Sequence, residues 1–482
     1  MKLIYDVNDR PEFKQSVIFA LQQMIAIMAA TLLVPILMSN YTLSDGATTL
    51  VFDPAAALFG AGIGTIVYTL CTKRRSPVFL GSSFTFLGAY QAIIGMNYGY
   101  WGVIIGILFA GLVYVVIALI IKMVGNAWVS KIMPTVIIGP IVVLIGLSLS
   151  STATTWMATN GGDTYSLLTI LVGAITFFAI VYVSVFGSKN LKLIPFIIGV
   201  GAGYILALVL TLIGNATGNA ALQILNLDIL KSIDSVVSLP KFTFLQAMRE
   251  HPAGLLPIDG AALGNIAMTF VPIGVVELAQ HIADHKNLSA IIEKDLIQDP
   301  GLDRTLLGDG LGSIIGGFFG GAANTTYGES IGCVAITGNA SIYSIMLAAI
   351  GCMLLSFFTP FVVLINSIPK CVMGGACVAL YGFIAVSGLQ MLKHVDLGNN
   401  KNLFVVSSIL VTGIGGLVLN FGSNPATGGP LLVMTSLATA LVMGILTNLI
   451  ANGGSMHQDT QDGLAQAAES MGEVEFTDDN KR

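Results

Sequence analysis

Glu329 is a carboxylate within a long apolar stretch of the sequence. It lies in the segment 323–338, where residues 324–327 are β-branched, polar or aromatic without a helical period, and residues 331–336 have the pattern of a short apolar helix. A carboxylate is costly to place in hydrocarbon, so such residues usually serve a function. We therefore predict a polar site at Glu329. The alternative is a re-entrant surface loop that exposes this glutamate.

A second group of polar side chains lies at the end of the eighth apolar stretch. Glu277, Gln280, His281 and Asp284 occupy positions i, i+3, i+4 and i+7, so a helix would carry them on one face. A polar face within lipid must point toward protein or a water-filled cavity. We expect Glu277 and Gln280 to lie deep in the membrane. The alternative for Asp284 and His285 is a place among the cytoplasmic headgroups.

Other polar residues interrupt apolar stretches singly. Gln22 and Gln23 in the first stretch require hydrogen-bonding partners, which a neighbouring helix or a ligand could supply. Asp309 in the ninth stretch either caps the preceding helix or serves the interior of the bundle. Tyr381 also needs a buried partner for its hydroxyl, although packing is the commoner reason for such a tyrosine.

The elements that hold these residues include two broken segments. Residues 79–86 repeat the pattern of the stretch around Glu329: small residues, then β-favouring residues at 84–86, then a short apolar run. Non-helical backbone at membrane depth survives only where protein or a cavity satisfies its polar groups. The two segments are third and tenth of fourteen, which predicts two inverted repeats of seven. Paired broken helices in inverted repeats are typical of secondary transporters.

Composition supports a polytopic membrane protein that is all-α apart from short β-strands in the broken segments. The chain has 482 residues, of which 55% are hydrophobic and 10% charged, whereas soluble domains are roughly a quarter charged. Most apolar segments are long enough to span a bilayer at about 20 residues each. The fourteen segments are 17–37, 51–71, 78–96, 101–123, 132–149, 165–186, 193–213, 262–280, 305–321, 328–337, 342–364, 371–389, 403–421 and 429–450.

The distribution of positive charge predicts the orientation. If the segments alternate with the N-terminus inside, all but four of the 21 Lys and Arg residues fall on the cytoplasmic side, the exceptions being Lys231, Lys241, Arg249 and Lys370. This asymmetry predicts a multi-pass protein of the cell membrane with both termini in the cytoplasm. The charged start leads into a full-length span, so we expect no cleaved signal peptide.

The remaining stretches carry simpler expectations. Residues 1–16 are a polar cytoplasmic N-terminus, 214–261 an extracellular connection between the repeats at 17–213 and 262–450, and 451–482 an acidic, disordered cytoplasmic tail. Residues 150–164 read as an outer loop, and 287–304 as a cytoplasmic amphipathic helix stopped at Pro300-Gly301. The five cysteines lack metal-ligand spacing, so we expect no metal or disulfide. The net charge of -5 argues against nucleic acid as a partner.

Several motifs, in order along the chain, resemble the nucleobase-ascorbate transporter family (nucleobase:cation symporter-2), most closely bacterial uracil and xanthine permeases. The matches are Gly81-Ser-Ser-Phe-Thr-Phe86, Lys294-Asp-Leu-Ile-Gln-Asp-Pro-Gly-Leu302, Asn324-Thr-Thr-Tyr-Gly-Glu329, Val372-Met-Gly-Gly375 and Leu380-Tyr-Gly382. The resemblance covers the chain to about residue 450 and implies a core domain of segments 1–4 and 8–11, a gate domain of 5–7 and 12–14, a homodimer and proton-coupled nucleobase uptake. It also implies that Phe84, Glu329 and Tyr381 line the site, with Glu329 bonding the base.

The chain departs from the family pattern at three positions. Gln23 stands where the family usually has His, Gln280 where it has the Glu of Glu-His-Ile-Gly-Asp, and Ser330 where it has Asn. Each change removes or alters a polar group, which bears on the substrate and the coupling ion. Asp284 keeps the acidic position of the family, and Glu277, one turn before Gln280, is an additional carboxylate that could replace the missing one.

We predict a secondary active transporter that imports a nucleobase, uracil before xanthine or uric acid, by proton symport with alternating access. The base would stack near Phe84, and its polar edge would be bound by Glu329, Gln280 and the backbone of the half-helix at Gly328 and Ser330. Gln23, Glu277, Asp284 and Tyr381 complete the predicted site and its support. The alternative is a facilitative or channel-like carrier, because Gln280 lacks a titratable proton. The sequence contains no nucleophile and base pair or metal set, so we expect neither an enzyme nor a cofactor.

Overall fold

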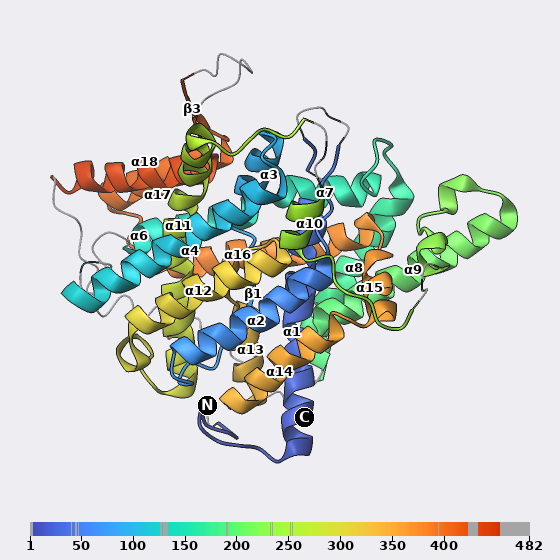
Figure 1. Cartoon of the computed structure of the whole chain (residues 1–482), viewed down its shortest axis with the longest axis horizontal. Helices are drawn as coiled ribbons and strands as arrows, with labels where there is room; N and C mark the ends of the chain where they lie inside the picture. The colour runs from blue at the N-terminus through green and yellow to red at the C-terminus, as the bar shows by residue number, and fades with distance from the viewer. Residues whose placement is uncertain are drawn as a thin grey trace.

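The structure is a computed structural model, and the chain folds into a helical bundle with two short pairs of strands (Figure 1). It describes residues 3–39, 41–43, 46, 48–125, 128, 134–188, 191–231, 233, 235–250, 252, 254–393, 395–422 and 432–453, with the backbone alone at 193, 279 and 432. Eight of the described helices are long and apolar enough to cross a membrane, and three shorter ones are also apolar. The tail predicted at 451–482 lies almost wholly outside these residues.

The elements of the first half of the chain are α1 (Phe13–Met38), α2 (Pro54–Cys71), β1 (Leu80–Ser82), α3 (Leu87–Gly95), α4 (Gly99–Val124), α6 (Thr135–Ser148), α7 (Ser150–Thr159), α8 (Leu167–Phe186), η1 (Leu191–Leu193), α9 (Pro195–Thr217), η2 (Ala220–Leu222), η3 (Leu227–Lys231) and α10 (Thr243–Arg249). Those of the second half are α11 (Gly260–Ile292), η4 (Ile297–Gly301), α12 (Leu302–Gly320), β2 (Asn324–Thr326), α13 (Gly328–Thr337), α14 (Ile342–Leu355), α15 (Thr359–Asn366), α16 (Lys370–Leu392), α17 (Asn400–Ile414), β3 (Leu419–Phe421), β4 (Leu432–Met434) and α18 (Ser436–Ala451). The order helix, helix, strand and short helix, helix occurs twice, from α1 to α4 and from α11 to α14.

The two broken segments meet as an antiparallel pair of strands inside the bundle. Leu80 pairs with Thr326 and Ser82 with Asn324, and these residues are buried. Because the strands are antiparallel, α3 and α13 leave the pair in opposite directions with their N-termini directed toward it. The pairing satisfies backbone groups that lipid could not. Helices α1 and α11 both pack against the broken segments.

Glycines bring α2 and α12 close enough to hold the strand pair. A Cβ atom added at Gly60 of α2 would lie 2.4 Å from the carbonyl oxygen of Gly316 of α12, and one added at Gly64 would lie 2.8 Å from that of Gly312. Small residues four apart allow such close packing between membrane helices. Asn324 of β2 then donates a hydrogen bond from Nδ2 to the carbonyl oxygen of Gly60 at 2.9 Å. The helix pair therefore fixes the depth of the strand pair.

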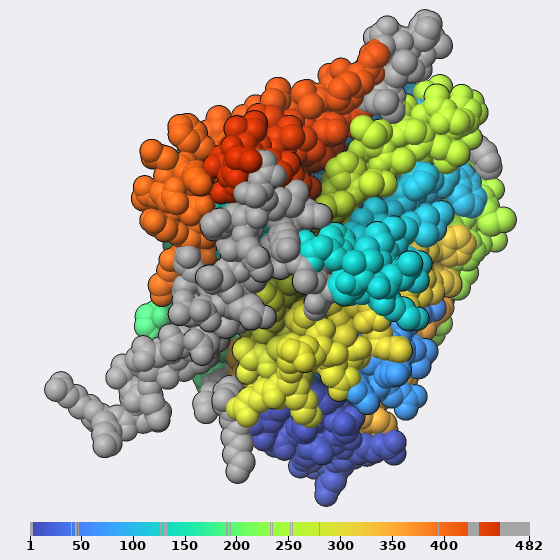
Figure 2. All heavy atoms as spheres, turned by 90° about the vertical axis from the view of Figure 1, so that its left-hand side faces the viewer, coloured from blue at the N-terminus to red at the C-terminus, as the bar shows by residue number. Residues whose placement is uncertain are grey.

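A second group of helices packs around α16. This helix contacts α6, α7 and α8, while α17 packs against α18 and α6. Figure 2 shows the orange and red C-terminal helices gathered at one end of this face and the blue N-terminal residues at the other. The first group, α1 to α4 with α11 to α14, surrounds the strand pair, and its helix α11 also contacts α6 and α18 of the second group.

The segments expected on one side of the membrane contact one another. Arg75, in the turn after α2, forms an ion pair with Asp299 before α12, and Lys294 lies 2.6 Å from Asp6 of the N-terminal segment. The segments expected on the other side also meet: the Lys241 amide donates to Asp53 at 2.7 Å. These three contacts each join segments that the prediction places on the same side of the membrane.

The structure corrects several boundaries. Residues 150–164 are not simply an outer loop, because α7 fills 150–159 and buries Ala153 and Trp156. Residues 287–304 do not form a separate amphipathic helix: α11 continues to Ile292, where Glu293 adopts a left-handed conformation, and a π-helical turn leads into α12. The first strand lies at 80–82 rather than at 84–86, and the stretch 342–364 is divided between α14 and α15.

Candidate functional site

The N-terminus of α13 faces open space beside the strand pair. Tyr327 is extended and precedes the first helical residue, Gly328, and its side chain does not cap the helix. Gly328 is exposed, and a Cβ atom added to it would meet nothing within 4 Å. The start of α3, after Phe86, also lacks a side-chain cap. Uncapped helix N-termini present free N–H groups that bind electronegative atoms.

Glu329 and Gln280 are polar side chains on α13 and α11, two helices that contact each other. Glu329 lies in the first turn of α13, is partly exposed, and forms no hydrogen bond with another described side chain. Gln280 on α11 is also partly exposed and without a hydrogen-bonding partner among the described residues. A carboxylate accepts hydrogen bonds only, whereas a primary amide both donates and accepts. The two side chains therefore offer donors and acceptors to a ligand, and Glu329 lies in a helix rather than in a surface loop.

Phe84 and Tyr381 form an aromatic wall at the contact between the two groups of helices. Their ring centroids are 5.8 Å apart and the rings are inclined at 78°. Phe84 precedes α3, and Tyr381 comes from the middle of α16. Both side chains are buried, and the Tyr381 hydroxyl has no hydrogen-bonding partner among the described residues. Tyr381 thus packs as expected while keeping an unused polar group.

Two of the three departures from the family pattern contact each other. Gln23 of α1 donates a hydrogen bond from Nε2 to Oγ of Ser330, and this oxygen also accepts from the Phe79 amide at 2.9 Å. Both side chains are buried. The change of His to Gln and the change of Asn to Ser therefore occur as one pair, which fixes the start of α13 against α1. Gln22, in contrast, leaves its Oε1 atom unpartnered among the described residues.

The two carboxylates of α11 bind to the broken segments on either side of Gln280. Ser83, just after β1, donates to Oε1 of Glu277 at 2.9 Å, and Thr326 of β2 donates to Oδ2 of Asp284 at 2.8 Å. Glu277 is fully buried and Asp284 partly exposed. His285 is buried as well, so its side chain packs within the protein.

A histidine and aspartate pair, which the sequence does not reveal as a pair, lies behind Glu277. Nδ1 of His281 is 2.6 Å from Oδ2 of Asp309, and its Nε2 is 3.1 Å from Oγ1 of Thr305. All three residues are fully buried. Asp309 therefore serves the bundle interior rather than a helix cap. The signal in the sequence is only that both polar residues interrupt apolar stretches.

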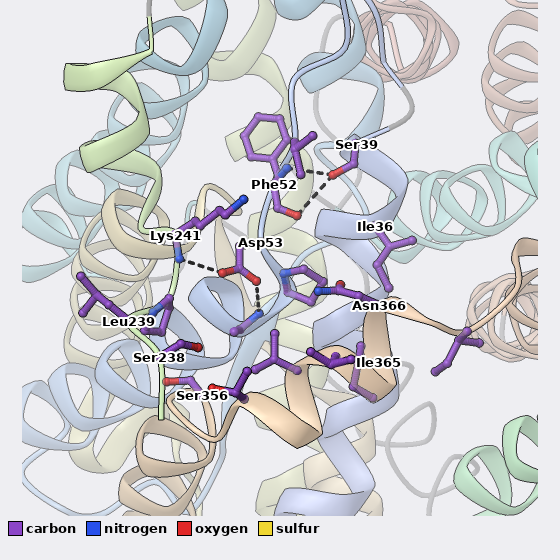
Figure 3. Close-up of a pocket in the computed structure, with 18 of the residues that line it drawn as sticks. Ile36, Ser39, Phe52, Asp53, Ser238, Leu239, Lys241, Ser356, Ile365 and Asn366 are labelled. Carbon is purple, nitrogen blue, oxygen red and sulfur yellow. Dashed lines mark hydrogen bonds between the residues drawn. The ribbon is translucent and has the colours of Figure 1, made fainter. Parts of the chain in front are cut away.

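A separate cavity of about 460 Å³ lies at the C-terminal end of α1, away from Gln23 (Figure 3). Its walls are the ends of α1 and α2, the segment 238–241 and α15. Asp53 in its wall is satisfied by the amides of Lys241 and Ala55, and Ser39 binds the backbone of Phe52. None of the predicted site residues lines this cavity. Ile36, in its wall, is 13 residues from Gln23, or about 20 Å along the helix.

Comparison with known proteins matches most of the chain. The sequence profile of the Permease family that covers xanthine and uracil permeases matches residues 14–421. The chain is 37% identical over 458 residues to the uracil permease of Bacillus caldolyticus, covering 94% of this chain and 95% of that protein. It is 30% identical over 447 residues to the uracil permease of Escherichia coli K12, covering 92% and 94%.

Solved transporter structures share the fold at low identity. The transmembrane domain of the cyanobacterial bicarbonate transporter BicA superposes with a TM-score of 0.54 at 14% identity, covering 93% of this chain and 100% of that domain. The murine anion transporter Slc26a9 gives 0.59 at 10% identity, covering 92% and 69%. These likenesses concern the fold alone. On the sequence match, the chain belongs to the xanthine/uracil permease family, nucleobase:cation symporter-2.

Proposed function

We propose that this protein is a secondary active transporter that imports a nucleobase, with uracil as the first candidate and xanthine or uric acid next. One observation carries the proposal: Glu329 and Gln280 are partly exposed without a partner among the described side chains, on two helices that contact each other, and the rings of Phe84 and Tyr381 contact across the two groups of helices. A nucleobase is a planar ring whose edge carries N–H donors and C=O acceptors. These are the groups that an aromatic wall, a carboxylate and an amide can bind together.

In this proposal the base lies near Phe84 and donates a ring N–H to Glu329. Gln280 and the free backbone N–H groups at Gly328 and Ser330 bind its carbonyl oxygens. Uracil permeases among the relatives support uracil over the larger purines. Neither Glu329 nor Gln280 bonds to another described side chain, so the site is free to receive a ligand.

Transport would proceed by alternating access in a multi-pass protein of the cell membrane. The repeated element order supports fourteen spans in two inverted repeats, 17–213 and 262–450, joined by an extracellular connection at 214–261. The helices around the strand pair would form the core domain and those around α16 the gate. The cytoplasmic N-terminus at 1–16, the cytoplasmic tail at 451–482 and a homodimer complete the proposal.

We also propose that transport is coupled to protons. Glu277 or Asp284 would take the role of the glutamate that Gln280 replaces, since both are hydrogen-bonded to the broken segments. A proton that binds one state of the carrier more tightly than the other is sufficient for coupling. The second candidate is a facilitative carrier, which the amide at Gln280 favours.

Uptake of radiolabelled uracil into proteoliposomes at equal pH on both sides tests the substrate. Saturable uptake that unlabelled uracil inhibits, with weaker inhibition by xanthine and uric acid, is the expected result. Inhibition by a purine alone would move the assignment to that purine. An absence of uptake by folded, correctly inserted protein would contradict nucleobase transport.

A further inference from the structure

A row of buried polar side chains leads away from the proposed site along α11. His281 and His285 lie one turn apart, their ring centroids are 4.1 Å apart, and both are at most 1% exposed. His285 directs Nδ1 to the carbonyl oxygen of His281 at 2.8 Å, so its Nε2 is available for other partners. That atom lies 2.6 Å from the Tyr68 hydroxyl on α2. Two ionisable rings thus contact each other inside the bundle, tilted at 30°.

Tyr68 carries the row to the end of α2. Its hydroxyl is 2.7 Å from Oγ of Ser76, and both residues are fully buried. Ser76 directly follows Arg75, whose side chain is about half exposed and pairs with Asp299. The row therefore ends at the face that also holds the ion pair of Lys294 and Asp6.

At the other end of the row, three oxygen atoms near Glu277 are unsatisfied. Oε2 of Glu277, Oδ1 of Asp309 and the Tyr114 hydroxyl are all buried and have no hydrogen-bonding partner among the described residues. Tyr114 of α4 lies within electrostatic range of both carboxylates, and its ring is 6.0 Å from that of His281. Buried polar atoms that lack protein partners are usually satisfied by an internal water, which needs two to four of them.

We propose that this row, from Glu277 through His281 and Asp309 to His285, Tyr68 and Ser76, is the route by which the coupling proton passes between the site and the face that bears Arg75. The inference rests on the proposed proton-coupled function. Glu277 and His285 are eight residues apart, which is about 12 Å of helix. Tyr68 extends the row toward the surface. His285 lies outside the stretch from Gln280 to Asp284 that corresponds to the family motif, so the resemblance assigns it no role.

The steps conserve the proton. Glu277 would release it to an internal water, from which it reaches Nδ1 of His281 through Asp309. Nε2 of His281 then gives up the proton that it shares with Thr305. Transfer to His285 requires one ring to turn about its Cβ–Cγ bond, which breaks the Nδ1 hydrogen bond of His285. His285 then releases the proton through the Tyr68 hydroxyl and Ser76. The two rings are too close to be charged together, so one proton on the pair excludes a second. The other titratable or charged groups near Tyr68 and the pair are Asp284 and Cys71, with Arg304 acting on Cys71.

The test separates proton movement from substrate movement in proteoliposomes. Exchange of labelled uracil at equal pH needs no net proton transfer, whereas accumulation driven by an imposed pH gradient does. We expect His285→Gln and Tyr68→Phe to lower gradient-driven accumulation by about tenfold or more while exchange stays within about twofold. Tyr100→Phe is the matched control, because its hydroxyl binds Val51 and Glu250 at the opposite end of the bundle. It should change neither measurement.

Three results would overturn the route. Accumulation like the parent in both variants means that the proton does not pass this way. Equal loss of exchange and accumulation, with an unchanged thermal unfolding temperature, means that the row only supports the substrate site. If the parent exchanges uracil but ignores the gradient, proton coupling itself fails and the route fails with it, while the substrate assignment stands.

Discussion

At the scale of single residues, the site combines one carboxylate with one amide. Glu329 can only accept hydrogen bonds when ionised, and Gln280 can satisfy either edge of a ligand. Neither side chain is bound to another described side chain, although both lie within the bundle. A polar group that loses water without gaining a partner is unfavourable, so a ligand that covers these side chains must supply hydrogen bonds.

The substitution Glu329→Gln should weaken uracil binding about tenfold to hundredfold. A carboxylate that accepts from a ring N–H forms a charge-assisted bond worth roughly 1.5 to 3 kcal/mol, which corresponds to this range. Equilibrium binding of labelled uracil to purified protein measures the loss. Glu12→Gln, at an exposed position before α1 that forms no side-chain cap, is the control. Unchanged affinity in folded Glu329→Gln protein would remove Glu329 from the site.

The contact between Gln23 and Ser330 predicts energetic coupling between these positions. We expect a double-mutant cycle of Gln23→Ala and Ser330→Ala to give a coupling of about 0.5 to 3 kcal/mol in stability or uracil affinity, because each single change breaks the same hydrogen bond. Thermal unfolding and uracil binding of the four proteins provide the cycle. Purely additive effects would show that the hydrogen bond between Gln23 and Ser330 contributes no measurable free energy.

At the scale of elements, the strand pair depends on the close approach of α2 and α12. A Cβ atom at Gly316 would lie 2.7 Å from the carbonyl oxygen of Gly60 and 1.9 Å from Nδ2 of Asn324. Both contacts are with groups that hold β2 in place, so enlarging this residue should disturb the site as well as the helix pair.

Gly316→Ala should therefore destabilise the protein by about 1 to 3 kcal/mol, as overpacking of a tight interior usually does. It should also weaken uracil binding, because Asn324 must move. Gly201→Ala in α9 is the matched control, since its Cβ would meet nothing within 4 Å. Thermal unfolding in detergent compares the two. A Gly316→Ala protein as stable as the control would show that α2 and α12 can move apart without a loss of stability.

The broken segments could be predicted because β-favouring residues interrupt apolar runs, but their partners could not. Residues 80–82 and 324–326 are far apart in sequence, and only the fold shows that they pair. The same holds for His281 and Asp309. Helix α7 was misread as a loop because Ser and Thr dominate it, although Ala153 and Trp156 pack against α16. Tertiary burial here outweighs local composition.

At the scale of the whole molecule, the proposed proton coupling requires a group that binds the proton close to the substrate site. Gln280 cannot bind it, and the carboxylates on either side hold the two broken segments through Ser83 and Thr326. Protonation of either carboxylate would change the hydrogen bonds of a strand that borders the site. Proton binding and substrate binding would then affect each other equally, as linkage requires.

Gradient-driven accumulation of uracil in proteoliposomes, with Glu277→Gln and Asp284→Asn compared with the parent, tests this account most directly. We predict that the parent accumulates uracil when the pH gradient is imposed, and that one of the two variants loses accumulation while it still exchanges labelled uracil at equal pH. Accumulation like the parent in both variants would contradict the assignment of the proton to these carboxylates. Exchange by the parent without any response to the gradient would contradict proton coupling and establish the facilitative carrier.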